Sequence, residues 1–278
     1  MNEHVRLIQE GTQLLSEAEV HRPQWTAEQL LAERLGCLPV DLYVQPPSVT
    51  EEICARYRSD VAARAGGVPL QYLLGSAEFY GRRFGVGPGV FNPRPETELL
   101  VETALELCSS GDRVADVGTG SGAIAVTLAA EWLPQDLQVT AVERSQVALH
   151  FAHRNAHVHG CPVRFVEGDL LEGFGPGSLD GIVSNPPYLD PERAGEWPKE
   201  LSWEPWLALS GGREGLELID RLTGQAAVAL RSGGWMTLEI GMEQAKKVGA
   251  IAARYDFRVE KIVKDLAGLD RVAVLWKN

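Results

Sequence analysis

The sequence contains few cysteines and no long hydrophobic run. Its four cysteines stand far apart among 278 residues and form no Cys-x-x-Cys pair. This spacing indicates neither a disulfide framework nor a zinc site. No apolar stretch approaches the ~18 residues of a membrane span, and the first residues lack the apolar segment of a signal peptide. We therefore expect reduced cysteines, no bound metal, no membrane segment and a cytoplasmic protein.

Basic residues are also scarce relative to acidic ones. The chain has 26 Lys and Arg against 38 Asp and Glu, a formal net charge of -12. Proteins that bind nucleic acid through many phosphates normally present a basic face. We expect no direct nucleic-acid partner, although a local basic patch is compatible with this balance. The length suits one large domain with a small one.

The first 75 residues show helical periodicity with capping signals. Thr26-Ala-Glu-Gln29 is a capping-box pattern that precedes apolar residues on one face and ends at Gly36. Ser48-Val-Thr-Glu51 is a second box, followed by Tyr57 and Val61 on an inward face. Residues 1–75 are therefore predicted to form a small helical bundle, which either recognises the substrate or only stabilises the protein.

The pattern changes twice after the bundle. Residues 76–92 are rich in glycine and aromatics and predict a β-hairpin linker. In residues 93–278, apolar strands alternate with amphipathic helices, which is typical of a parallel sheet covered on both faces. Strands are expected at 113–117, 138–143, 163–167, 179–184, 234–240, 257–263 and 271–276, and helices at about 96–108, 122–132, 145–158, 215–231 and 243–254.

The last two predicted strands are separated only by residues 264–270. This connection is too short for a crossover helix, so the final strand should run antiparallel. A seven-stranded α/β sheet with a reversed last strand describes the Rossmann-like fold of class I methyltransferases.

A glycine-rich turn follows the first strand of this sheet. Gly118-Thr-Gly-Ser-Gly122 allows positive φ and a close approach of backbone to a ligand. Such a turn also binds the pyrophosphate of dinucleotides. Glu143, which ends the second strand, can accept hydrogen bonds from both hydroxyls of an adenosine ribose. Asp116 favours S-adenosylmethionine over NAD, because its carboxylate is unfavourable near a pyrophosphate but suits an amino group and a sulfonium.

Two further residues follow the third strand. Asp169 is positioned to accept from the adenine amine, while Leu170 would pack on the ring. Alternatively, Asp169 caps the turn, and Glu143 is an exposed charge before the next helix. We favour the ligand role for Glu143, because it shares the carboxyl-terminal sheet edge with Asp116 and Asn185.

Asn185-Pro186-Pro187-Tyr188 follows the fourth strand and carries the most specific chemistry. Two successive prolines donate no backbone hydrogen bonds, so the carbonyl groups of Asn185 and Pro186 are free to accept. A planar amide or aromatic amine has an NH2 group that needs such acceptors, and Tyr188 can lie against its face. These residues predict methyl transfer to a planar nitrogen. A simple turn is the alternative for the two prolines alone.

These motifs together resemble bacterial protein-(glutamine-N5) methyltransferases of the HemK or PrmC type, which modify the glutamine in the Gly-Gly-Gln motif of class I peptide-chain release factors. The resemblance covers nearly the whole chain and is carried by Pro69–Gly75, Glu78–Gly81, Pro93–Glu98, Asp116–Gly122, Asn185–Tyr188, Glu204-Pro205 and Ala208-Leu209. It implies S-adenosylmethionine as cofactor, a release factor as protein partner and a monomeric enzyme.

The resemblance also assigns site residues. The cofactor site would include Asp116, Gly118, Thr119, Gly120, Ser121, Gly122, Glu143, Asp169, Leu170 and Asn185. Asn185, Pro186, Pro187 and Tyr188 would hold the substrate glutamine, with Asn185, Pro186 and Tyr188 catalytic and Phe91 facing Tyr188 across the amide. Two positions depart from the family pattern: Glu143, where Asp is common, and Asn92, where an apolar residue is usual.

Other substrates stay open at this point. A ribosomal protein could present the glutamine instead, and a nucleic-acid adenine-N6 methyltransferase would use the same tetrapeptide on a flipped base. A third alternative is a non-catalytic binding module with the same fold. The Trp197, Trp203 and Trp206 segment is either a lid or docking surface, or ordinary loop packing.

Overall fold

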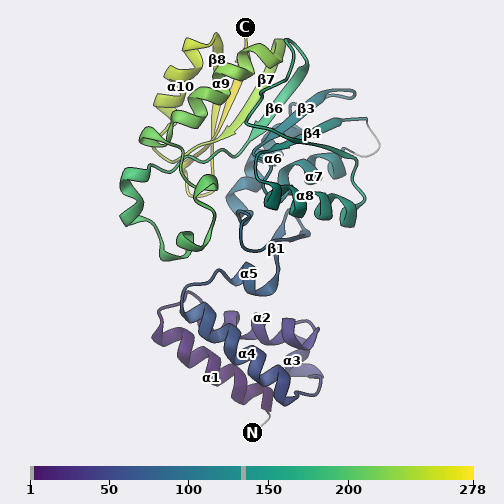
Figure 1. Ribbon diagram of the computed structural model, residues 1–278, viewed down its shortest axis with the longest axis vertical. Helices are drawn as coiled ribbons and strands as arrows, with labels where there is room; N and C mark the ends of the chain where they lie inside the picture. Colours follow the sequence, from purple (N-terminus) through teal and green to yellow (C-terminus); the bar gives the residue numbers. More distant parts are fainter. Residues whose placement is uncertain (1–2, 133–135) are drawn as a thin grey trace. The chain divides into compact units, whose positions relative to one another are not determined.

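The computed structural model describes residues 3–132 and 136–278 (Figure 1). The chain divides into two compact units. One consists of Met1–Ser76 with Pro198–Trp203, and the other of Ala77–Trp197 with Glu204–Asn278. Met1 and Asn2, the start of the predicted bundle, lie outside the described residues.

The first unit is the predicted helical bundle. Its helices are α1 (Glu3–Glu17), α2 (Pro23–Leu35), α3 (Asp41–Val44), α4 (Glu51–Ala65) and α5 (Leu70–Leu74). Leu7, Leu30, Leu31 and Tyr57 are almost completely buried between α1, α2 and α4. The Tyr57 hydroxyl donates to the Leu7 carbonyl at 3.1 Å, which satisfies its polar end inside this core.

Both predicted capping boxes are wrong in position. Helix α2 begins at Pro23, so Thr26 is a buried residue of the first turn rather than the cap. Proline at the first position of a helix has a fixed φ that suits this start, and it overrides the Thr26 signal. Helix α4 is capped by Thr50, whose Oγ1 accepts from the Ile53 amide at 3.3 Å.

The second unit contains the predicted seven-stranded sheet. Its strands are β3 (Arg113–Val117), β4 (Gln138–Glu143), β5 (Val163–Glu167), β6 (Leu179–Ser184), β7 (Leu230–Glu239), β8 (Phe257–Lys264) and β9 (Asp270–Lys277). Their order in the sheet is β5-β4-β3-β6-β7-β9-β8, and β9 is antiparallel to both neighbours. The predicted fold class and the reversed last strand are confirmed. Strand β7 begins four residues earlier than expected.

Alternate residues of the central strands pack into two separate cores. Val114 and Val183 face a core with α6 (Glu98–Leu105), α7 (Ala123–Glu131) and α8 (Gln146–His159). Ala115 and Ile182 face the opposite core with α9 (Glu217–Ala229) and α10 (Ala245–Arg254). Figure 1 shows the two helix groups on different sides of the sheet. A central parallel sheet buried on both faces explains why its strands read as continuous apolar runs.

The predicted hairpin forms from β1 (Ser76–Phe79) and β2 (Arg82–Gly85). Phe79 and Phe84 are buried in the core of the second unit, with ring centroids 6.0 Å apart. The hairpin is therefore packed as part of this unit.

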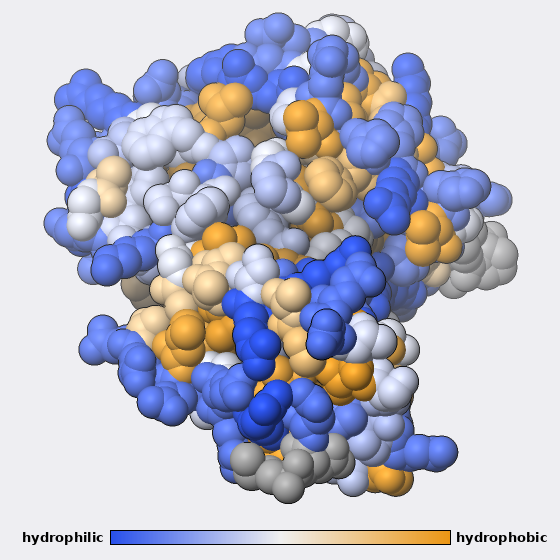
Figure 2. All heavy atoms as spheres, turned by 60° about the horizontal axis from the view of Figure 1, so that its bottom comes forward, coloured by the Kyte–Doolittle hydropathy of each residue, from blue (hydrophilic) through white to orange (hydrophobic). Residues whose placement is uncertain are grey.

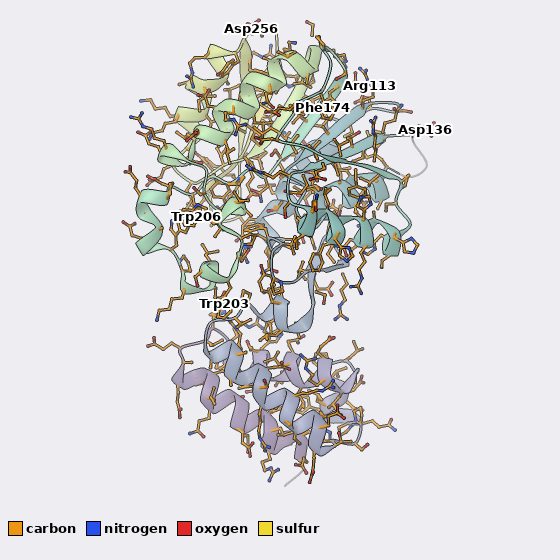
Figure 3. The ribbon with its side chains drawn as sticks, viewed as in Figure 1. Arg113, Asp136, Phe174, Trp203, Trp206 and Asp256 are labelled. Carbon is orange, nitrogen blue, oxygen red and sulfur yellow. The ribbon has the colours of Figure 1, made fainter. Side chains whose placement is uncertain are left out.

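A long irregular connection follows β6. It contains the short 3-10 helices η2 (Pro191–Glu196), η3 (Lys199–Trp203), η4 (Trp206–Ala208) and η5 (Arg213–Gly215). In Figure 3, Trp206 of this connection lies far from Arg113, the first residue of β3. The connection thus belongs to the carboxyl-terminal edge of the parallel strands, where ligands bind in open α/β sheets.

Candidate active site

The glycine-rich turn joins β3 to α7 and is built on positive φ. Gly118, Gly120 and Gly122 have φ of 75°, 56° and 81°, conformations that favour glycine. A Cβ atom at Gly118 or Gly120 would meet nothing within 4 Å, whereas one at Gly122 would lie 3.1 Å from Ala152 of α8. The first two glycines therefore leave open space beside the backbone, and the third permits close packing of two helices.

Asp116 holds this turn from inside the protein. Its carboxylate is fully buried, and its Oδ2 accepts from the Thr119 hydroxyl at 2.5 Å and from the Ala125 amide at 3.0 Å. Burial raises the pKa of Asp116 to about 7, against the lowering effect of these two hydrogen bonds. The Thr119 and Ser121 side chains are buried as well. The turn consequently presents its backbone rather than its side chains.

Glu143 connects the turn to the end of β4. Its Oε2 accepts from the Gly120 amide at 3.0 Å, and its Oε1 accepts from the Arg144 and Ser145 amides at 2.9 Å. A carboxylate has about four acceptor positions, so one stays available. The side chain is half-buried. Glu143 therefore shapes the turn and can still accept from a ligand hydroxyl.

The segment after β5 has an unusual backbone. Leu170 has φ of 56°, a left-handed conformation that is rare for a leucine and that marks a constrained site. The Leu171 amide donates to the Gln225 side chain at 2.7 Å, which helps to hold this segment. Asp169 is paired with Arg221 at 2.8 Å. An adenine amine would therefore share the Asp169 carboxylate with a guanidinium.

Asn185 is fixed by a residue from a distant segment. Its Nδ2 donates to the Thr97 Oγ1 atom at 3.1 Å. Thr97 is buried and lies in η1 (Pro95–Thr97), within the Pro93–Glu98 motif. This bond engages one of the two hydrogens of the Asn185 NH2 group and fixes the amide, whose Oδ1 then points away from Thr97 and can accept from a substrate.

Tyr188 is anchored at both ends. Its hydroxyl donates to Glu239 Oε1 at 3.2 Å, and its carbonyl accepts from Gln244 Nε2 at 3.0 Å. Burial of the ring and the neighbouring Glu239 raise the pKa of the Tyr188 phenol. Gly215 has φ of 69°, and a Cβ there would lie 2.1 Å from the Tyr188 carbonyl oxygen. Both the phenol hydroxyl and the backbone carbonyl of Tyr188 are thus fixed.

Glu239, the last residue of β7, is the buried acid beneath Asn185-Pro-Pro-Tyr188. Its side chain is almost fully buried, and its Oε1 accepts a hydrogen bond from the Tyr188 hydroxyl at 3.2 Å. Burial raises the pKa of Glu239 to about 7, while the nearby Thr97 and Tyr188 hydroxyls and Arg271 act in the opposite direction. The aromatic ring of the predicted substrate site is therefore held through its hydroxyl by this carboxylate.

Residues 91–94 are tied to the connection after β6. The Arg94 guanidinium forms an ion pair with buried Glu204 and lies 4.9 Å from the centre of the Phe91 ring. Glu204 also accepts from the backbone amide of Asn92 at 3.2 Å. The Asn92 side chain is fully buried, and its two polar atoms have no partner within residues 3–132 and 136–278. Arg94 and the Asn92 backbone thus link this segment to the connection after β6 through Glu204.

Comparison with known proteins decides the family. Residues 6–75 match the model of the PrmC N-terminal domain, and residues 84–196 match that of the methyltransferase small domain. A release factor glutamine methyltransferase of Koribacter versatilis is 43% identical over 94% of this chain and 93% of its own length. The protein of the same name from Nitratidesulfovibrio vulgaris is 40% identical over 98% of this chain and 94% of its own.

The chain belongs to the release factor glutamine methyltransferase family. Solved structures support the fold of this family member. A methyltransferase from Pyrococcus furiosus is similar, with a TM-score of 0.54 at 20% identity over 82% of this chain and 98% of its own. A ribosomal protein L11 methylase from Lactobacillus delbrueckii has a TM-score of 0.51 at 21% identity. The match covers 69% of this chain and 84% of that protein's chain.

The residues of this family member fit an adenosine-containing ligand. The open space beside Gly118 and Gly120, and the free acceptor position of Glu143, lie on neighbouring strand ends. Leu170 is half-buried two strands away from β3 and offers an apolar surface. The described residues contain no group of three or more His, Cys, Asp and Glu arranged to hold a metal ion.

Sequence reasoning missed three supporting residues. Thr97, Glu239 and Gln244 contact Asn185 or Tyr188, yet they lie 88, 51 and 56 positions away along the chain. Thr97 lay within a motif already singled out, and Glu239 is a carboxylate in an apolar strand. An acidic residue in a buried strand end is the signal that could have identified Glu239.

Proposed function

We propose that the protein transfers a methyl group from S-adenosylmethionine to the side-chain amide nitrogen of the glutamine in the Gly-Gly-Gln motif of release factors. The orientation of Asn185 carries this proposal, because its NH2 group donates to Thr97 at 3.1 Å and no side chain or backbone group of the described residues donates to its Oδ1. A planar amide needs two acceptors for its NH2 group, and the Pro186 carbonyl is the second. Membership of the family supports the choice of a release factor as substrate.

The cofactor would be held by the turn and the neighbouring strand ends. Bound S-adenosylmethionine supplies an electrophilic methyl group on its sulfonium. The backbone of Gly118 and Gly120 would lie beside the cofactor, the remaining acceptor position of Glu143 would take a ribose hydroxyl, and Leu170 would pack on the adenine. Asp116 would act from inside by fixing the turn.

An amide nitrogen is a poor nucleophile, since its lone pair is delocalised into the carbonyl. Asn185 and Pro186 would accept its two hydrogens, which places the nitrogen and favours positive charge developing on it. The Tyr188 ring, held through its hydroxyl by Glu239, would lie against the amide plane. No strong base is required, because the nitrogen becomes acidic as it gains the methyl group.

The helical unit is proposed to contact the release factor. Around α3 it exposes Leu38, Val40, Tyr43 and Val44, with 67% of Leu38 and 77% of Val44 accessible. Clustered exposed apolar side chains are typical of protein interaction sites. On the face shown in Figure 2, hydrophobic residues are interspersed with hydrophilic ones.

Mass spectrometry of the modified substrate tests the proposal. The protein is incubated with S-adenosylmethionine and a release factor, and the tryptic peptide that contains Gly-Gly-Gln should gain one methyl group on the glutamine. Parallel reactions contain ribosomal proteins or DNA. Methylation of a ribosomal protein or of adenine without methylation of the release factor would contradict the proposal.

Asn185→Ala provides the first specific prediction. The variant removes the side-chain acceptor, so methyl transfer should fall below detection while cofactor binding weakens moderately. Transfer of a tritiated methyl group measures the first effect, and isothermal titration with S-adenosylmethionine measures the second. Turnover near that of the wild type would exclude this role for Asn185.

A further inference from the structure

We propose that Asn155 of α8 is a positioning residue for the cofactor site, because its side-chain amide ties the glycine-rich turn to the hairpin. The inference rests on the proposed function, in which S-adenosylmethionine lies beside this turn. It adds a residue that holds the turn in its binding conformation. Asn155 is 3% exposed and lies within α8, outside the motifs that predict the site.

The Asn155 amide forms three hydrogen bonds with two backbone segments. Its Oδ1 accepts from the Gly85 amide at 2.7 Å, and its Nδ2 donates to the Gly85 carbonyl at 3.0 Å. The same Nδ2 donates to the Ser121 carbonyl at 2.8 Å. Both hydrogens of the NH2 group are thereby used, so the orientation of the amide is fixed. One buried side chain therefore joins the end of β2 to the turn between β3 and α7.

The Ser121 carbonyl depends on this donor. In a regular helix it would accept from the amide four residues later, which belongs to Ala125. The Ala125 amide donates to Asp116 Oδ2 at 3.0 Å instead, and α7 begins only at Ala123. Asn155 supplies the donor that the helix does not. The turn is thus held by two buried groups, Asp116 from β3 and Asn155 from α8.

The hairpin end of this contact is itself packed closely against α8. Residues 85–89 run along the helix, where three alternate glycines approach it. With a Cβ atom, each glycine would lie 2.9–3.2 Å from a helix side chain, and the pairs are Gly85 with Asn155, Gly87 with Phe151 and Gly89 with Val147. The three helix residues are four positions apart and therefore share one face. The amide consequently ties the turn to a segment that has little room to move.

Loss of the Asn155 donor should act on cofactor affinity. Ser121 is 3% exposed, so water does not replace the hydrogen bond to its carbonyl. The turn would then spend part of its time in other conformations, and the apparent affinity falls with the fraction that is still competent to bind. A buried hydrogen bond of this kind corresponds to a change of about tenfold. Saturating cofactor restores the competent turn, so kcat should change little.

Asn155→Asp tests the donor role with little change of shape. Its carboxylate still accepts from the Gly85 amide but donates to neither carbonyl, so isothermal titration should give a Kd for S-adenosylmethionine at least about tenfold above that of the wild type. In Asn155→Ala, which introduces no charge, the Kd should also rise about tenfold. Unfolded molecules lower the number of binding sites in the titration rather than the affinity. The kcat for release-factor methylation at saturating cofactor should stay within about twofold.

Hydrogen exchange reports on the turn without any ligand. In both variants, the backbone amides of Gly118–Gly122 should exchange faster than in the wild type when the protein is free of cofactor. A role of Asn155 in packing alone would leave this exchange and the Kd unchanged.

His159→Ala is the matched control. His159 lies one turn after Asn155 on α8, and its side chain contacts the hairpin. Its Nε2 donates to the Arg83 carbonyl at 3.0 Å, and its ring centre lies 5.0 Å from that of Phe84. The variant weakens the hairpin contact without removing a bond to the turn, so its Kd and kcat should equal those of the wild type.

Three results would overturn the inference. They are wild-type cofactor affinity in Asn155→Asp or Asn155→Ala, an equal loss of affinity in His159→Ala, and failure of both Asn155 variants to fold, which would show that Asn155 supports the unit as a whole. A wild type that binds no S-adenosylmethionine would instead contradict the proposed function, so the two failures are distinguishable.

Discussion

At the scale of single residues, the sequence indicates which groups do chemistry but not what holds them. Asn185, Glu143 and Asp116 are predicted as site residues because their amide and carboxylate groups lie at strand ends along one edge of the sheet. Their partners come from elsewhere, as Thr97 does for Asn185. Hydrogen-bond partners distant in sequence depend on tertiary packing, and no local pattern encodes them. The predicted roles of Asp169 and Leu170 stay predictions.

Glu143 provides a prediction at this scale. Glu143→Ala removes an acceptor from the Gly120, Arg144 and Ser145 amides, so the free energy of unfolding should fall by about 2 kcal/mol. Affinity for S-adenosylmethionine should fall at least about tenfold, which corresponds to ~1.4 kcal/mol. Urea unfolding and isothermal titration measure the two effects.

Glu143→Asp serves as the control for this prediction. It retains the charge but shortens the side chain, so the variant should bind the cofactor better than Glu143→Ala. Wild-type cofactor affinity in Glu143→Ala would show that the carboxylate has no part in the site.

At the scale of elements, periodicity predicted most of the fold and local capping signals predicted less. The strands of the second unit are predictable as apolar runs because both faces of the sheet are buried. The capping boxes failed at Thr26 and Ser48, where Pro23 and Thr50 define the helix starts instead. Several residues in a short window satisfy the same capping pattern, and for α2 the proline at the first helical position decides between them.

The contact between α7 and α8 gives the second prediction. Gly122→Ala combines a left-handed backbone with a Cβ atom 3.1 Å from the Ala152 backbone, so it should destabilise the protein by roughly 2–4 kcal/mol. Gly160→Ala is the matched control, since Gly160 has φ of 63° and open space around it. Its cost should be only about 1 kcal/mol. If urea unfolding shows the same loss of unfolding free energy in Gly122→Ala and Gly160→Ala, packing of α7 on α8 does not require Gly122.

At the scale of the whole molecule, one feature of the helical unit was beyond sequence reasoning. Residues Pro198–Trp203 belong to this unit although they follow β6 in the chain. Arg64 forms an ion pair with Glu200, and a Cβ at Gly67 would lie 3.4 Å from the Trp203 ring. The segment shows neither helical nor strand periodicity, so its sequence gives no indication of where it packs.

Two buried carboxylates make the stability of the second unit depend on pH. Burial raises the pKa of Asp116 and of Glu239 to about 7, well above the value of about 4 that such groups have in an unfolded chain. Their favourable contribution to the free energy of unfolding is fully present below the pKa that they have in the unfolded chain. It is lost as the pH rises through their folded-state pKa of about 7. The free energy of unfolding should therefore fall between about pH 4 and pH 7.

Asp116→Asn tests this dependence. The asparagine oxygen can accept from Thr119 and Ala125 as the carboxylate does, while the site no longer titrates. The fall in unfolding free energy between pH 5 and 8 should be smaller in the variant by on the order of 3 kcal/mol, because each pKa unit corresponds to about 1.4 kcal/mol. Asp265→Asn is the control, since the hydrogen bond from Arg271 lowers the pKa of Asp265 and its effect lies at more acidic pH. Urea unfolding at several pH values gives the free energy of unfolding as a function of pH for each variant. Parallel curves for Asp116→Asn and the wild type would show that Asp116 does not titrate in this range.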